Sequence, residues 1–213
     1  MRKAICLFAF VAVLASISCK KDNPTPGSSN TNNNNNNNNN NTVTVNSTPQ
    51  FTGTIGGTAY SYVTGTVYSG GTSSSKSLGG NPNTATYQTY MNNTSSGQPF
   101  LGITKGTLTL TQGNFADTAS LDAFFAPGTY SYSASNGIVI QWLDASGNVY
   151  STAQGSGVQT GSVFKITAKR AQGLVYGTYQ VATMATFNCT LYSISGTAVV
   201  LTNGVYVGVF GND

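Results

Sequence analysis

The chain has 213 residues, of which only 7% are charged, and nine Lys and Arg residues outweigh five acidic residues to give a formal charge of +4. From residue 50 onward the balance is five basic against four acidic residues, a net charge of +1, whereas a nucleic-acid-binding domain needs a strongly basic surface. The sequence contains no His and no Glu, which removes the usual zinc ligands and most general acid–base groups. We therefore predict no nucleic-acid partner, no metal, no cofactor and no enzymatic activity.

The first 19 residues predict export. Arg2 and Lys3 precede an apolar stretch at positions 4–17 and then Cys19, a layout typical of a secretory signal. The stretch is shorter than the roughly 20 residues of a membrane-spanning helix. Cys19 and the Lys-Lys-Asp after it resemble the start of a mature Gram-negative lipoprotein, although Ser16 stands where the usual lipobox has Leu. The resemblance implies a lipoprotein signal peptide at residues 1–18 and acylation of Cys19, through diacylglycerol and palmitate, at the outer membrane. An ordinary signal peptide is the alternative, and whether the protein faces the periplasm or the cell surface stays open.

Residues 19–49 predict a tether. They include an unbroken run of Asn at positions 32–41, flanked by Pro, Gly, Ser and Thr. Such a low-complexity segment has too little apolar area to offset the entropy of ordering, so we expect a disordered linker. Self-association of the Asn run into β-structure is the alternative.

Residues 50–213 predict an all-β domain, because runs of β-branched and aromatic residues alternate with Gly and Asn. We expect an antiparallel β-sandwich or a partly closed barrel of about ten strands, and only positions 116–125 favour a short helix. Two-residue hairpin turns are expected at Gly56-Gly57 and Asn203-Gly204, and a longer hairpin turn at 144–148. The expected strands are 50–55, 59–68, 84–91, 100–110, 128–134, 137–143, 149–154, 162–168, 175–192 and 197–210, the last two forming one or two strands each.

Short motifs in this domain resemble small Gram-negative lipoprotein domains of unknown function. These are an aromatic strand with a glycine turn at 51–60, Pro-Gly-Thr-Tyr at 127–130, Gly-Thr-Tyr at 177–179 and Thr-Asn-Gly-Val-Tyr-Val at 202–207. The resemblance implies a β-rich fold and an anchored location. It carries no catalytic residue.

Tyrosines supply the candidate binding residues. Tyr60 and Tyr62, and likewise Tyr130 and Tyr132, stand two apart, which places both rings of each pair on one face of a strand. A tyrosine combines an apolar ring with a polar tip, which suits stacking on sugars. The alternative is that these rings cover the core, as we expect for Trp142.

The remaining reactive residues predict structural roles. Cys189 lies in a strand-like run and is expected to be a small buried apolar residue. Asp117 and Asp122 are expected to cap or turn the chain, and Asp144 lies in a turn too short to supply a calcium site. Asp117-Thr118-Ala119 resembles the acceptor of a bacterial O-glycosylation system, which makes Thr118 a candidate modification site.

Three functions are compatible with these observations. The first is a membrane-anchored, non-enzymatic lipoprotein whose β-domain binds a glycan or protein partner at the cell envelope. The second is a carrier or sensor with a small apolar ligand inside a β-barrel pocket. A structural role in the envelope is an alternative to the first function. The third is an unrecognised hydrolase or inhibitor module, which would need two Asp carboxylates converging in a cleft. The sequence does not predict the oligomeric state.

Overall fold

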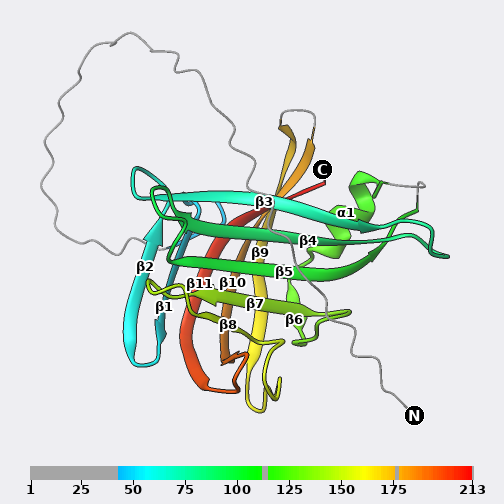
Figure 1. The fold of residues 1–213 in the computed structure, drawn as a ribbon. Helices are drawn as coiled ribbons and strands as arrows, with labels where there is room; N and C mark the ends of the chain where they lie inside the picture. Colours follow the sequence, from blue (N-terminus) through cyan, green and yellow to red (C-terminus); the bar gives the residue numbers. More distant parts are fainter. Residues whose placement is uncertain (1–42, 112–114, 176–177, 213) are drawn as a thin grey trace, which may run out of the picture. The chain divides into compact units, whose positions relative to one another are not determined.

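The computed structural model describes residues 43–111, 115–175 and 178–212, which belong to a single compact unit. The predicted signal peptide, Cys19 and the Asn run lie outside the described residues. The unit is built from antiparallel strands and one short helix (Figure 1), which confirms the all-β fold class. The elements are β1 (Gln50–Ile55), β2 (Thr58–Val63), β3 (Tyr68–Ser77), β4 (Thr84–Asn93), β5 (Phe100–Thr109), α1 (Thr118–Phe124), β6 (Gly128–Tyr130), β7 (Ile138–Leu143), β8 (Val149–Ser151), β9 (Val163–Val175), β10 (Thr178–Ser193) and β11 (Ala198–Asn212).

One sheet curls into a partly closed barrel. Its strand order is β2-β1-β11-β10-β8-β7-β5-β4-β3, and β9 pairs with β10 and with the short β6. Figure 1 shows β3, β4, β5 and β7 crossing the direction of β1, β2, β10 and β11, so that the sheet folds over its own inner face. The curl brings β3 and β4 against β11. There the backbone N–H of Gly211 donates to Thr72 Oγ1 over 2.7 Å. We call this contact zone between β3 and β11 the seam.

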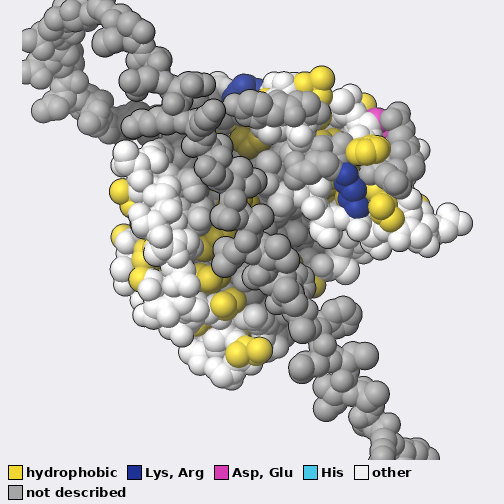
Figure 2. Space-filling view, turned by 45° about the horizontal axis from the view of Figure 1, so that its top comes forward, with side chains coloured by type: hydrophobic (Ala, Val, Ile, Leu, Met, Phe, Trp, Pro, Cys, Tyr) yellow, Lys and Arg dark blue, Asp and Glu magenta, His cyan; other side chains and the backbone are white. Residues whose placement is uncertain are grey.

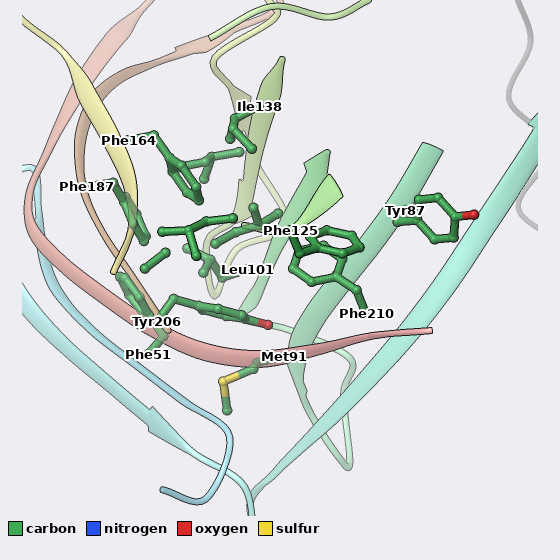
Figure 3. Close-up of a cluster of buried hydrophobic side chains, with 14 of the residues drawn as sticks. Phe51, Tyr87, Met91, Leu101, Phe125, Ile138, Phe164, Phe187, Tyr206 and Phe210 are labelled. Atoms are coloured by element: carbon green, nitrogen blue, oxygen red, sulfur yellow. The ribbon is translucent and has the colours of Figure 1, made fainter. Parts of the chain in front are cut away.

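The two groups of crossing strands form two layers of the curled sheet, and side chains from both layers fill the space between them (Figure 3). The rings of Phe51 and Phe164 each stack on Phe187, with centroids 6.2 and 5.6 Å apart, and Phe125 of the α1 C-cap stacks on Phe210 at 4.3 Å. Burial of each such ring contributes roughly 1.5–3 kcal/mol to the stability of the fold. Aromatic packing therefore holds the two layers together.

The turns at Gly56-Gly57 and 144–148 are confirmed, whereas the Asn203-Gly204 hairpin was wrong. β11 continues through these two residues. Phe187 lies opposite Gly204 and Cys189 opposite Leu201, so β11 holds one extra residue at this point, which is a β-bulge. Asn203 has φ 53°, a left-handed conformation that occurs in one class of β-bulge as well as in tight hairpin turns. A Cβ on Gly204 would lie 2.6 Å from Phe187 Cε2, so only glycine at this position leaves enough space for the Phe187 ring.

The other predicted elements had different outcomes. β3 was not predicted, because its Ser- and Gly-rich sequence has low β-propensity. The segments 175–192 and 197–210 were each expected to form one or two strands. After β9 ends at Val175, the first segment forms the single strand β10, and the second forms the single strand β11. The short helix expected within 116–125 is confirmed as α1. None of the described residues forms a helix long and apolar enough to cross a membrane.

Candidate functional site

A continuous row of five aromatic rings lies where the edge strand β2 faces β7 and β8. Successive ring centroids are 4.8 Å (Tyr68–Tyr62), 6.0 Å (Tyr62–Tyr60), 5.6 Å (Tyr60–Trp142) and 5.3 Å (Trp142–Tyr150) apart. The rings come from β2, β3, β7 and β8, so segments far apart in sequence build the row. We call this set the aromatic row.

The row has a buried floor and partly exposed members. Tyr62 is 2% exposed and Trp142 6%, and Trp142 Nε1 donates to the Tyr62 hydroxyl over 3.4 Å. Burial raises the pKa of Tyr62 to about 12, so this hydroxyl stays neutral at all physiological pH values. Tyr60, Tyr68 and Tyr150 are half-buried. Within the described chain their three hydroxyls have no hydrogen-bond partner, which leaves them available to solvent or to a ligand.

The structure separates the two predicted tyrosine pairs. Tyr60 and Tyr62 share one face of β2, as their spacing predicted, and both belong to the aromatic row. Tyr130 and Tyr132 lie elsewhere: the Tyr130 hydroxyl donates to Ala126 O over 2.5 Å, and the Tyr132 hydroxyl donates to Asn188 O over 2.9 Å. Burial raises the pKa of both. Their polar tips are therefore engaged within the fold.

Two members of the aromatic row were not among the predicted binding residues. Tyr68 begins β3, the strand that the sequence did not predict, and Tyr150 lies in the three-residue strand β8. Trp142 was expected in the core, and its low exposure confirms that placement. The hairpin of β7 and β8 sets Trp142 opposite Tyr150. The long-range contact between Tyr60 and Trp142 joins this pair to the tyrosines of β2 and β3.

A buried lysine lies in the interior, away from the aromatic row. Lys105 is 5% exposed, and its Nζ is 3.6 Å from the ring centroid of Phe124 and 4.2 Å from that of Tyr130. Tyr87 and Ile138 lie opposite Lys105 on the neighbouring strands. Among the described residues Lys105 forms no ion pair. Burial lowers the pKa of its ammonium to about 8, because the charged form loses hydration that the two rings replace only in part.

Asp117 and Cys189 have the predicted roles, whereas Asp122 does not. Asp117 is the N-cap of α1 and accepts from the Ser120 N–H over 2.8 Å, while its neighbour Thr118 is exposed at the first helical position. Asp122 is not a cap: it lies within α1 and pairs with Lys169 of β9. Cys189 is a free thiol, 2% exposed, and burial raises its pKa to about 12.

The described surface is poor in charge. Figure 2 shows few Lys, Arg, Asp or Glu side chains on the face it presents, in keeping with the composition. Across the described residues no group of three or more His, Cys, Asp or Glu side chains could hold a metal ion.

No family model, no curated protein and no solved structure matches the chain. The resemblance to Gram-negative lipoprotein domains therefore stays a prediction, and the case for a site rests on the geometry of the aromatic row.

Proposed function

We propose that this protein is an exported lipoprotein, anchored through Cys19 at the outer membrane, whose β-domain binds a neutral glycan on the aromatic row without acting as an enzyme. The tether predicted at residues 19–49 would give the domain reach, because about 30 residues of flexible chain span a root-mean-square distance near 30 Å. The observation that carries the binding proposal is the set of half-buried rings with unpartnered hydroxyls.

The chemistry of the aromatic row suits a carbohydrate. A sugar ring offers an apolar C–H face and a rim of hydroxyls, and tyrosine offers the complementary pair of a flat ring and a hydroxyl. Tyr60, Tyr68 and Tyr150 are already held in position by ring contacts, so little side-chain entropy is lost on binding. The scarcity of charge favours a neutral ligand.

The filled interior favours surface binding over the carrier alternative. Phe51, Leu101, Phe164, Phe187 and Tyr206 occupy the space in which an enclosed apolar ligand would lie (Figure 3). A protein partner or a structural role in the envelope would use the same surface without sugar stacking, and the binding experiment below distinguishes these roles.

The test is a titration of residues 20–213 with neutral oligosaccharides. Trp142 is the only tryptophan of the chain, so its fluorescence reports on the aromatic row alone. We expect a saturable change in fluorescence, and binding that is weakened about five- to thirtyfold in Tyr60→Ala, since stacking of one ring is worth about 1–2 kcal/mol. Tyr60→Phe should retain most of the affinity, because it keeps the ring.

Tyr179→Ala is the matched control, because it removes the ring of a half-buried tyrosine outside the aromatic row. A glycan library that gives no saturable binding, measured by fluorescence and calorimetry, would refute the glycan proposal and leave the protein-partner and structural roles.

A further inference from the structure

A second feature lies at the seam, beside one end of the aromatic row. A hollow of ≈ 210 Å³ opens there between β3, β4, β10 and β11. Its volume is about that of seven water molecules at roughly 30 Å³ each, which is small for a drug-sized ligand and suits a single ring. The lining residues are Pro49, Gly70, Gly71, Thr72, Thr89, Tyr90, Gln180, Tyr206 and Val209.

The hollow exists because the barrel closes without strand pairing at this point. β3 and β11 are joined at the seam by the hydrogen bond from Gly211 N–H to Thr72 Oγ1. Gly70 and Gly71 carry no side chain: a Cβ on Gly71 would lie 2.4 Å from the hydroxyl of Tyr90, and a Cβ on Gly70 would lie 3.1 Å from Thr64 Cγ2 and 3.6 Å from Pro49 Cβ. Gly71 therefore makes room for the Tyr90 ring, and a side chain at Gly70 would crowd Pro49 at the lining of the hollow.

Hydroxyl and amide groups surround this space. At its base the Thr89 and Tyr206 hydroxyls pair over 3.1 Å, and both residues are 1% exposed. The Gln180 side chain, which is half-buried at the hollow, has no hydrogen-bond partner in the described part of the chain, although an amide offers two donors and an acceptor. No lining residue is charged, so the lining favours a neutral, hydroxyl-bearing ligand.

The hollow lies near the Tyr68 end of the aromatic row. Tyr68, the end of the row, stands two residues before Gly70 on the same strand, a separation of about 7 Å on one face. We infer that the hollow binds the terminal residue of a neutral glycan, with Gln180 and the Thr89–Tyr206 pair bonding its hydroxyls, while the aromatic row stacks on the units that follow. This inference rests on the proposed function and adds to it that the protein recognises the end of a glycan chain.

The test measures the two parts of the site separately. In a titration of isotopically labelled residues 20–213 with single neutral monosaccharides, the side-chain amide signals of Gln180 report on the hollow, and the Trp142 indole signal reports on the row. We expect at least one monosaccharide to shift the Gln180 signals and leave the indole signal unchanged. Gln180→Leu should weaken its binding at least fivefold, because it removes one or more ligand hydrogen bonds.

Two further variants keep the test decisive. Gln141→Leu, on a half-buried glutamine of β7, is the matched control and should bind as the wild type does. Gly70→Ala narrows the hollow without touching Gln180 and should also weaken monosaccharide binding.

The outcomes distinguish the two proposals. Oligosaccharide binding that needs Tyr60 but is unchanged in Gln180→Leu and Gly70→Ala would overturn the inference and leave the proposed function standing. Monosaccharide binding at Gln180 without oligosaccharide binding on the row would support the hollow and contradict the role of the row. If neither the Gln180 amide signals nor the Trp142 indole signal changed with any saccharide, both the inference and the glycan proposal would be overturned.

Discussion

Replacing Lys105 by Met should stabilise the protein at pH 7 and remove one component of its pH dependence. Lowering the pKa of this ammonium from 10.5 to about 8 corresponds to about 3 kcal/mol in favour of the neutral form on folding. Contacts with the rings of Phe124 and Tyr130 favour the charged form by about 1–2 kcal/mol in total. The net cost of burying the charge is then about 1–2 kcal/mol, and Met fills nearly the same volume without it.

The sign of the pH dependence follows from linkage. Below pH 8 the folded and unfolded chains both hold the proton on Lys105, so the cost is constant. Between pH 8 and 10.5 only the unfolded chain holds it, and the contribution of Lys105 to stability rises with pH. Cys189 and Tyr62 act in the opposite sense, because burial raises their pKa values and the unfolded chain loses those protons first.

The assay therefore compares variants at each pH. The free energy of unfolding is measured by urea denaturation at pH 7, 8, 9 and 9.5, with Trp142 fluorescence as the signal. The advantage of Lys105→Met over the wild type should be largest at pH 7 and shrink towards pH 9.5, whereas Lys165→Met, on an exposed lysine of β9, should show no such trend. A variant less stable than the wild type at pH 7, or a difference independent of pH, would refute the reasoning.

Three further predictions concern other parts of the chain. Gly204→Ala should lower the free energy of unfolding by about 1–3 kcal/mol, because the added methyl would lie 2.6 Å from a ring carbon of Phe187, whereas Gly65→Ala, with open space around its Cβ, should change it by less; equal effects in urea denaturation would contradict this. Cys19→Ala should abolish labelling by an alkyne analogue of palmitate and release the protein from the membrane fraction; labelling that persists would contradict the anchor. Thr118→Ala should remove a hexose-containing addition from the intact mass of protein from its native host, and a wild-type mass without any addition would contradict modification of this exposed residue.

A turn could be predicted from the local sequence where the residue pair is compatible with one kind of structure only. The hairpin turn at Gly56-Gly57 falls in this class, since two consecutive positive φ values between strands have few other uses. Asn203-Gly204 does not, because a left-handed residue serves a bulge as well as a turn. The choice between them depends on Phe187, which packs on Gly204 from the neighbouring strand.

The site was predictable in part for a similar reason. The two-residue spacing predicted that Tyr60 and Tyr62 lie on one face of a strand. It could not predict that Tyr60 contacts Trp142, because β2 and β7 are not hydrogen-bonded neighbours in the sheet. Lys105, by contrast, carried a readable signal: Leu101 and Ile103 precede it at alternate positions, so the period of β5 already directed residue 105 towards the core.

The composition of β3 has a consequence for how copies of this protein meet one another. β3 ends the sheet order, and a terminal strand offers, where the seam does not cover it, backbone groups on which another chain can add. Long, flat, apolar edges invite aggregation, whereas β3 combines Ser and Gly with Lys76 near its end. The Ser- and Gly-rich composition, which made β3 hard to predict, also disfavours pairing of β3 with a strand of another copy of the protein.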